Sequence, residues 1–336
     1  MCSVDPHLPA GGTPLAGGGM SSPHTAMPAG KQEAMITNPN VKINLGLNVL
    51  RKREDGFHEL DTLFVPYFGI SDTLEIVIGD DYSRTSAALF AKYGPDQLAP
   101  SQASEKPEGV FGVERAENDA PKLVQGISDD GKLMITIARE EGVDWDPLKD
   151  LCAKAYTILS RDFDLPPVKI FLEKTSPVGA GLGGGSSDAA FALKMLNELC
   201  SLNITQEQLA AYAAELGSDC AFFIYNRPMR GQGRGEILTP YDIDLSSYDI
   251  QVITPAGIAV STKDAYGGIR PHLPELPLIE VLAKPIEEWD GLLVNDFEET
   301  VFAKYPELAA IKRSLYDCGA VYASMSGSGS ALFALY

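Results

Sequence analysis

The sequence has little of what several classes of protein depend on. It holds 27 Lys and Arg against 46 Asp and Glu, a net charge of −19. This argues against a nucleic acid or an anionic membrane as the main partner, because a negative field repels both. No run approaches the ~20 continuous apolar residues that a membrane-spanning helix needs. The five cysteines are scattered and odd in number, and the four histidines are dispersed. They indicate neither a disulfide framework nor a metal cage built by the protein.

The remaining composition is typical of a cytoplasmic globular protein with reduced cysteines. With 336 residues, 45% of them hydrophobic, the chain is long enough for one large or two medium domains. Residues 1–34 are rich in Pro, Gly, Ser and Met and carry almost no charge. They lack the apolar core of a secretory signal. We expect a disordered extension there, with a functional arm or a start-site artefact as the alternatives.

The most informative stretch is a glycine run followed by serines and small residues, from 177 to 190. Glycines let backbone N–H groups approach a ligand without a side chain in the way. Ser186 or Ser187 is predicted to cap the helix behind the run, where Ala189, Leu193 and Leu196 recur at helical spacing. A flexible linker is the alternative, but the run lies between a strand-like segment (168–172) and this helix. The pattern therefore predicts a phosphate-binding loop at a helix N-terminus.

The rest of the chain mixes strands and helices without regular βαβ repetition, which predicts α+β architecture. Alternating apolar residues predict strands at 41–49, 74–78, 133–138, 168–172 and 331–336. Helical spacing predicts helices at 151–159, 205–216 and 308–315, the second opened by a capping box at Thr205 and closed by Gly217. From 80 to about 130 the periodicity is lost, so we expect an inserted, mobile surface loop without a catalytic role.

The glycine run matches neither the Walker loop nor the dinucleotide-binding fingerprint. It resembles, nearly residue for residue, the ATP-binding loop of the GHMP kinases, named for galactokinase and the homoserine, mevalonate and phosphomevalonate kinases. The segment from Asn38 to Leu47 resembles the first motif of that family, and Met325 to Ala331 resembles the third. Three motifs in the family's order are more specific than any one alone.

Further segments resemble one group of GHMP kinases, those that phosphorylate the 2-hydroxyl of a cytidine diphosphate-linked methylerythritol in the non-mevalonate isoprenoid precursor pathway. Residues 53–64 are similar to that group's Asp-Gly-Tyr-His segment, with Phe57 in place of the tyrosine. Residues 217–223 and 233–238 match two more of its segments. The resemblance runs from about residue 36 to the C-terminus, and the family usually has a shorter connection where this chain has residues 80–130.

The resemblance implies a two-domain GHMP kinase fold with the active site between the domains. The N-terminal domain, expected at 35–200, would contain a left-handed βαβ unit, which departs from the usual handedness. The C-terminal domain, expected at 201–336, would be ferredoxin-like. The chain stops directly after its last predicted strand, so we expect that a terminal element is missing. Either a monomer or a homodimer is compatible with this fold.

The resemblance also implies ATP and Mg²⁺ as cofactors and assigns roles to three residues. Asp219 would be the base that takes the acceptor's proton, Lys42 the cation that keeps it ionised, and Asn44 the residue that orients one of them. The alternatives are a solvated carboxylate at a helix end for Asp219 and a solvated strand charge for Lys42. Ser187 is a Mg²⁺ contact by analogy only. The expected ATP-binding residues are Pro177, Gly179, Gly181, Leu182, Gly183, Gly184, Gly185, Ser186, Ser187, Ser326, Gly327, Ser328 and Gly329.

The substrate end is expected at Phe57, His58, Thr262 and Tyr266, by similarity to the family segments that enclose the cytosine base. Aromatic rings stack on the flat face of a base, and an imidazole can read its edge. For Phe57, packing in the core is the alternative.

Two other functions stay open at this point. One is a different GHMP kinase, of the homoserine or mevalonate type, which the segment around Phe57 and His58 disfavours. The other is an inactive binding protein with the GHMP fold, since fold alone does not secure function. The presence of Lys42 and Asp219 together with all three glycine-serine motifs disfavours the second.

Overall fold

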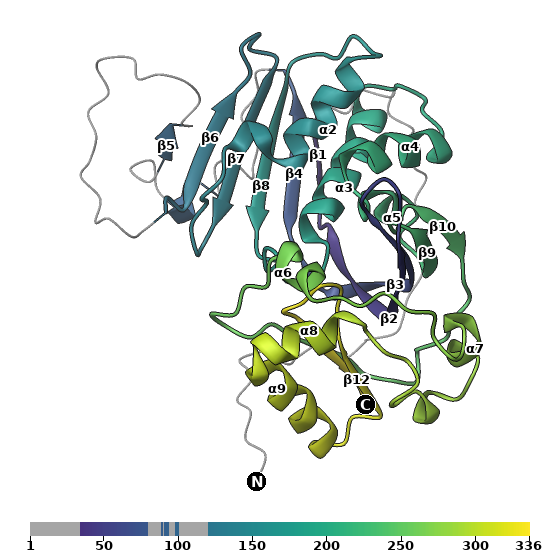
Figure 1. Cartoon of the computed structure of the whole chain (residues 1–336). Helices are drawn as coiled ribbons and strands as arrows, with labels where there is room; N and C mark the ends of the chain where they lie inside the picture. Colours follow the sequence, from purple (N-terminus) through teal and green to yellow (C-terminus); the bar gives the residue numbers. More distant parts are fainter. Residues whose placement is uncertain (1–33, 80–88, 90, 94–97, 101–119) are drawn as a thin grey trace, which may run out of the picture. The chain divides into compact units, whose positions relative to one another are not determined.

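The computed structural model describes residues 34–79, 89, 91–93, 98–100 and 120–336, and within them the chain forms three β-sheets with helices packed against them (Figure 1). The expected N-terminal extension therefore lies outside the described residues, apart from Ala34. No helix among the described residues is long and apolar enough to cross a membrane.

The largest sheet has six strands in the order β1-β4-β8-β7-β6-β5. They are β1 (Ala34–Thr37), β4 (Thr73–Ile78), β8 (Val168–Lys174), β7 (Leu133–Arg139), β6 (Leu123–Ile127) and β5 (Leu98–Pro100). Strands β7 and β8 are parallel neighbours. They are joined by η2 (Pro147–Lys149) and α2 (Leu151–Ser160), which form the expected βαβ unit with them.

The helices that pack with this sheet form the largest hydrophobic core. They are α2, α3 (Gly184–Leu199), α4 (Gln206–Leu216) and α5 (Cys220–Tyr225). Helix α3 contacts α2, α4 and α5. Its small residues Ala189, Ala190 and Ala192 are fully buried, which allows this close packing. The predicted capping box at Thr205 is confirmed, because its side chain accepts from the Gln208 N–H and the Gln208 side chain bonds back.

A second sheet has the order β10-β9-β3-β2, and it provides the floor of the site described below. Its strands are β2 (Asn40–Lys52), β3 (His58–Ser71), β9 (Met229–Gly233) and β10 (Ile237–Pro240). The alternation that predicted β2 places Val41, Ile43 and Leu45 in a hydrophobic core. The opposite face is also buried, with Lys42 and Asn44 almost inaccessible. Strands β9 and β10 follow residue 200, yet β9 pairs with β3, so hydrogen bonds cross the expected domain boundary.

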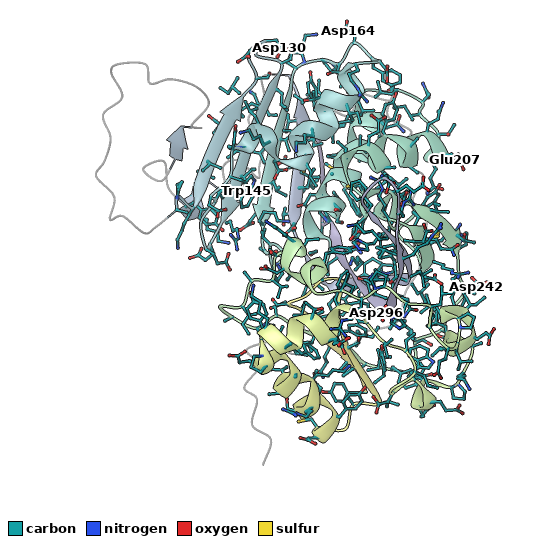
Figure 2. The ribbon with its side chains drawn as sticks, in the orientation of Figure 1. Asp130, Trp145, Asp164, Glu207, Asp242 and Asp296 are labelled. Atoms are coloured by element: carbon teal, nitrogen blue, oxygen red, sulfur yellow. The ribbon has the colours of Figure 1, made fainter. Side chains whose placement is uncertain are left out.

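The third sheet is antiparallel and has the order β11-β13-β12. Its strands are β11 (Ile250–Ile253), β13 (Leu332–Leu335) and β12 (Tyr322–Met325), and the helices of this region are α6 (Thr262–Gly267), α7 (Leu278–Leu282), η3 (Ile286–Glu288), α8 (Phe297–Lys304) and α9 (Pro306–Asp317). Asp296, labelled in Figure 2, fastens this region to β2 by accepting the backbone N–H of Val49 at 2.7 Å.

The expected insertion at 80–130 falls partly outside the described residues, and those parts carry no structural statement. Where it is described, the expectation of an irregular loop is wrong in two places. Strands β5 (Leu98–Pro100) and β6 (Leu123–Ile127) lie within it, and β6 pairs with both β5 and β7. Leu89 and Tyr93 are buried against Val77 and Phe171. These apolar residues do not recur at the spacing of a helix or a strand, so the sequence pattern did not predict that they are buried.

Candidate active site

A cavity of about 460 Å³ opens between the second sheet, the glycine run and α6. Its lining combines backbone glycines with a few polar and aromatic side chains, as ligand sites commonly do. The residues that line it are Lys42, Asn44, Leu47, Leu60, Thr62, Phe64, Gly179, Gly181, Gly183, Ser218, Asp219, Arg234, Val260, Ser261, Thr262, Tyr266, Phe297, Gly327 and Ser328.

The glycine run forms a loop that is bonded to its neighbours through its backbone. The N–H of Lys42 donates to Leu182 O at 2.9 Å, and the N–H of Ala331 donates to Ala180 O at 3.0 Å. The loop ends at Gly183, a left-handed residue at the N-cap of α3. The prediction that Ser186 or Ser187 caps this helix is wrong, because no side chain caps it. The N-terminal N–H groups of a 16-residue helix are therefore left for an anion.

The loop of the third motif lies against the glycine loop. Ser326 Oγ donates to Gly181 O at 3.0 Å. Asn295 holds the other side, with its Nδ2 donating to Met325 O at 2.7 Å and to Gly327 O at 2.9 Å. The two glycine-serine motifs, distant in sequence, are thereby fixed side by side at the cavity. The sequence analysis missed Asn295, which lies in none of the recognised motifs.

Lys42 and Asp219 face each other at one end of the cavity. The Nζ atom of Lys42 lies 3.5 Å from Asp219 Oδ2, and the exposed fractions of the two side chains are 3% and 31%. The same Nζ donates to Gly181 O at 2.8 Å and to Asn44 Oδ1. Asn44 is oriented in turn by Thr62, whose Oγ1 accepts from Asn44 Nδ2 at 2.9 Å. The structure thus brings the three expected catalytic residues together.

Burial and charge act in opposite directions on the lysine of this pair. Burial lowers the pKa of Lys42 below its usual value, and the negative charge and hydrogen bond of Asp219 offset only part of that effect. The more exposed carboxylate of Asp219 is the member of the pair that solvent or an acceptor hydroxyl can reach. Its position directly before α5, after the Gly217 that ends α4, matches the sequence prediction.

A stacked aromatic pair reaches the cavity through Tyr266, which lines it, whereas His58 does not. The rings of His58 and Tyr266 are stacked with centroids 4.8 Å apart, and Tyr266 meets Phe297 edge to face at 4.7 Å. Tyr266 and Thr262 line the cavity. Burial and the charge of Lys52 lower the pKa of His58, so its imidazole is neutral at pH 7 and presents one donor and one acceptor. Burial raises the pKa of Tyr266 to about 12.

Phe57 does not line the cavity. Its side chain is 53% exposed, and the guanidinium of Arg234 lies 4.9 Å from the centre of its ring. Arg234 does line the cavity and was missed as a site residue, although residues 233–238 were recognised as a family segment. Thr62 and Ser218, two more lining residues, also lie within recognised segments. A sequence motif does not by itself show which of its side chains point into a cavity.

Several expected ATP-binding residues are not among those that line the cavity. Pro177, Gly184, Gly185, Ser186 and Ser187 do not line it, and Leu182 packs in the core. Ser326 and Gly329 are buried, while Gly327 and Ser328 line it. Ser187 Oγ is fully buried and has no hydrogen-bond partner.

No group of three or more His, Cys, Asp or Glu side chains suited to a metal occurs among the described residues. This is compatible with Mg²⁺, which binds through one or two protein oxygens and the phosphates of its nucleotide. The orphaned hydroxyl oxygen of Ser187 and the accessible carboxylate of Asp219 are oxygen ligands of the type that Mg²⁺ prefers.

Comparison with known proteins agrees with this geometry. Residues 150–227 match the family model of the GHMP kinases N terminal domain, and residues 278–336 match that of the GHMP kinases C terminal. The 4-diphosphocytidyl-2-C-methyl-D-erythritol kinase of Bacteroides fragilis is 41% identical over 302 residues, which is 90% of this chain and 92% of that protein. The protein of the same name from Bacteroides thetaiotaomicron is 42% identical with the same coverage.

Solved structures show the same relationship. A crystal structure of 4-(cytidine 5'-diphospho)-2C-methyl-D-erythritol kinase superposes with a TM-score of 0.61 at 29% identity, covering 90% of both chains. A homoserine kinase from Cytophaga hutchinsonii reaches 0.60 at 14% identity, covering 93% of this chain and 88% of that one, and shows the fold alone. The expected α+β GHMP kinase fold is confirmed. The chain belongs to the 4-diphosphocytidyl-2-C-methyl-D-erythritol kinase family of GHMP kinases, which makes it an ATP-dependent phosphotransferase.

Proposed function

We propose that this protein transfers the γ-phosphoryl group of ATP to the 2-hydroxyl of 4-diphosphocytidyl-2-C-methyl-D-erythritol, in the non-mevalonate isoprenoid precursor pathway. The observation that carries the proposal is one cavity that brings together two different kinds of group. A buried lysine and an accessible carboxylate, 3.5 Å apart, lie beside the glycine loop. A stack of imidazole and phenol rings reaches the same cavity through Tyr266. The first suits phosphoryl transfer and the second suits recognition of a base.

In the proposed reaction, Asp219 accepts the proton of the 2-hydroxyl while that oxygen forms its bond to the γ-phosphorus. The bond from the γ-phosphorus to the oxygen bridging to the β-phosphate breaks, and ADP leaves. The ammonium of Lys42 lies 3.5 Å from the carboxylate of Asp219 and offsets negative charge on the transferring group. Asn44 is a positioning residue, because it accepts from the Lys42 Nζ and is itself held by Thr62.

The nucleotide phosphates are held by the glycine loop and the uncapped N-terminus of α3, where backbone N–H groups and the helix dipole favour anions. Ser328 and Gly327 form the facing wall. Mg²⁺ offsets phosphate charge when bound, and we propose Ser187 as the loop residue nearest to that role. Its Oγ is a buried side-chain oxygen in the first turns of α3 that has no hydrogen-bond partner among the described residues.

Substrate choice is tested by removing the two rings that stack. His58→Ala and Tyr266→Ala are each expected to raise KM for the cytidine substrate about 5- to 150-fold, because stacking on a base contributes roughly 1–3 kcal/mol. KM for ATP is expected to change less than about twofold. Steady-state kinetics in an ADP-coupled assay, with either substrate varied, measures both constants. Phe57→Tyr is expected to leave both constants near their wild-type values, because it keeps an aromatic ring and restores the tyrosine usual in this family segment.

The same assay compares wild-type protein on the cytidine substrate, homoserine and mevalonate. Turnover of homoserine or mevalonate at an equal rate, or an unchanged cytidine KM in both alanine variants, contradicts the substrate assignment. The absence of turnover on all three would favour an inactive binding protein.

Arg234 offers a second test of substrate recognition. Lys42 and Arg234 are the two cationic side chains that line the cavity, and Lys42 is already paired with Asp219. A guanidinium suits the diphosphate that links cytidine to the sugar alcohol. Arg234→Met is expected to raise KM for the cytidine substrate about tenfold, and Arg234→Lys is expected to raise it less. An equal rise in KM for ATP would place the guanidinium on the nucleotide instead.

A further inference from the structure

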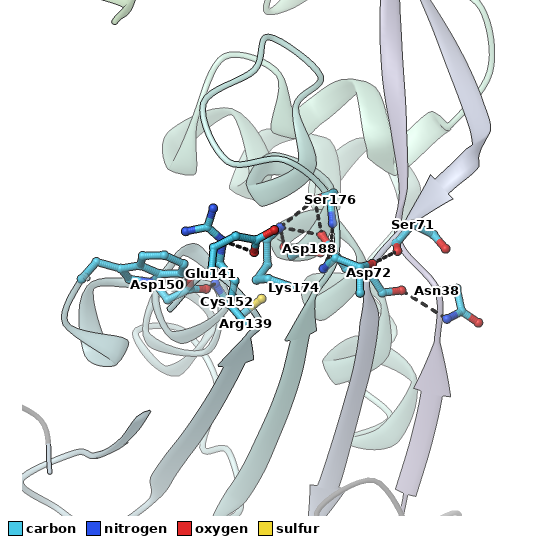
Figure 3. A network of polar contacts seen from close by, with 12 residues as sticks. Asn38, Ser71, Asp72, Arg139, Glu141, Asp150, Cys152, Lys174, Ser176 and Asp188 are labelled. Atoms are coloured by element: carbon cyan, nitrogen blue, oxygen red, sulfur yellow. Dashed lines mark hydrogen bonds and ion pairs between the residues drawn. The ribbon is translucent and has the colours of Figure 1, made fainter. Parts of the chain in front are cut away.

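A cluster of buried charges lies behind the glycine loop, outside the cavity (Figure 3). It contains Lys174 at the end of β8, Asp72 between β3 and β4, and Asp188 on α3. The exposed fractions of these residues are 5%, 1% and 1%. Burying charges is costly unless each is paired, and apolar replacements of buried ion pairs are often as stable. The pairing is therefore weak evidence for a role in stability alone.

The ammonium of Lys174 lies between the two carboxylates. It donates to Asp72 Oδ2, and to Asp188 Oδ2 at 2.7 Å. Asp72 also fixes the backbone that enters the loop, since its Oδ1 accepts the N–H groups of Thr175 and Ser176, both at 2.7 Å. Ser176 Oγ donates to Asp72 Oδ2 at 2.6 Å. The cluster thereby holds the last residues before the loop.

Asp188 attaches the far end of the loop to the same ammonium, because it lies in the second turn of the helix that begins at Gly184. Lys174 Nζ thus bridges the segment that enters the loop and the helix that leaves it. The cluster is in contact with the loop, because a Cβ on Gly184 would lie 2.3 Å from Ser176 Oγ and 3.3 Å from Lys174 Nζ. Fixing both ends of a loop reduces the conformations available to it, and so orders its N–H groups before a ligand arrives.

We propose that Lys174 and Asp188 are positioning residues for nucleotide binding, which hold the glycine loop in its phosphate-binding conformation by closing its two ends. This rests on the ATP site proposed above, and it is independent of which alcohol accepts the phosphoryl group. The bridging hydrogen bond from Lys174 to Asp188 is the link on which the role depends.

Two nearly isosteric variants separate the hydrogen bond from the charge. Asp188→Leu removes the acceptor. Lys174 keeps Asp72 as its partner in this variant, so its buried ammonium is not left unpaired. Asp188→Asn removes the ionisable carboxyl group and keeps an acceptor oxygen for Lys174. Asp188→Leu is expected to weaken binding of Mg·ATP about tenfold and to raise KM for ATP equally. Asp188→Asn is expected to stay within about threefold of wild type, and KM for the cytidine substrate is expected to stay within twofold in both variants.

Binding of Mg·ATP is measured by calorimetry, so the comparison stands even if the acceptor assignment fails. Leu165→Ala is the control for lost stability, since this buried leucine precedes the opposite end of β8. It is expected to lower Tm without changing ATP affinity. If Asp188→Leu does not fold, Ser176→Ala removes the hydroxyl beneath Gly184 and is expected to weaken ATP binding several-fold.

Unchanged ATP affinity in the folded leucine variant, or in Ser176→Ala where that replaces it, overturns the proposal. So does an equal rise of KM for both substrates, which would indicate general distortion of the site. An asparagine variant as impaired as the leucine variant also overturns it, because charge rather than the link would then be responsible.

Discussion

Asp219→Asn is expected to lower kcat by about 10²–10⁴-fold, the range for loss of one general base. The amide keeps the size of the carboxylate but does not take a proton from the acceptor hydroxyl. It also removes the negative charge 3.5 Å from Lys42 Nζ. KM for ATP is expected to change little, because Asp219 lies beside the loop and does not form it. Steady-state kinetics on the purified variant measures both constants.

The matched control is Asp130→Asn, the same chemical change at an aspartate that does not line the cavity. It is expected to leave kcat at the wild-type value. Near-wild-type turnover by Asp219→Asn, in protein shown by mass spectrometry to be free of deamidation, would contradict the assignment of the base.

Gly181→Ala is expected to raise KM for ATP at least about 100-fold. Gly181 has φ +78°, and a Cβ there would lie 2.1 Å from Ser326 O. A left-handed conformation costs a residue with a Cβ about 1–2 kcal/mol, and overpacking adds about 1–3 kcal/mol. The two glycine-serine loops would have to separate, and about 3 kcal/mol corresponds to a hundredfold change in affinity. Calorimetric titration with ATP measures the loss.

Gly131→Ala is the control for backbone strain alone, since Gly131 has φ +69° and nothing within 4 Å of an added Cβ. It is expected to lower Tm slightly and to leave ATP binding intact. A Gly181→Ala protein that is folded and binds ATP like wild type would contradict the role of the loop.

Much of the fold and part of the site could be predicted, because local patterns reported local structure. Alternation over residues 41–49 indicated β2, and Thr205 with Gln208 indicated the start of α4. Lys42, Asn44 and Asp219 were found through motifs, and the structure brings them together. Burial of both faces of β2 could not be predicted, because it depends on elements more than a hundred residues away in sequence.

The remaining differences have particular physical causes. A serine before an apolar repeat is a good signal for a helix cap. The N-cap of α3 is instead Gly183 in a left-handed conformation, which has no side chain to form a cap. Phe57 was expected on the cytosine, but its ring lies under Arg234 and outside the cavity lining. Its part in binding stays a prediction. Strand β6 has five residues and is held in place by pairing with β7. Its own residues show no alternation from which a strand could be predicted.

The carbonyl oxygen of Gly181 accepts from both Lys42 Nζ and Ser326 Oγ. Rotation of this peptide group would break both hydrogen bonds and displace the lysine from the carboxylate it faces. These two hydrogen bonds fix the glycine loop at Gly181, although a glycine-rich composition is associated with flexibility. Its conformational entropy is lost when the protein folds, so little remains to be lost when the nucleotide binds.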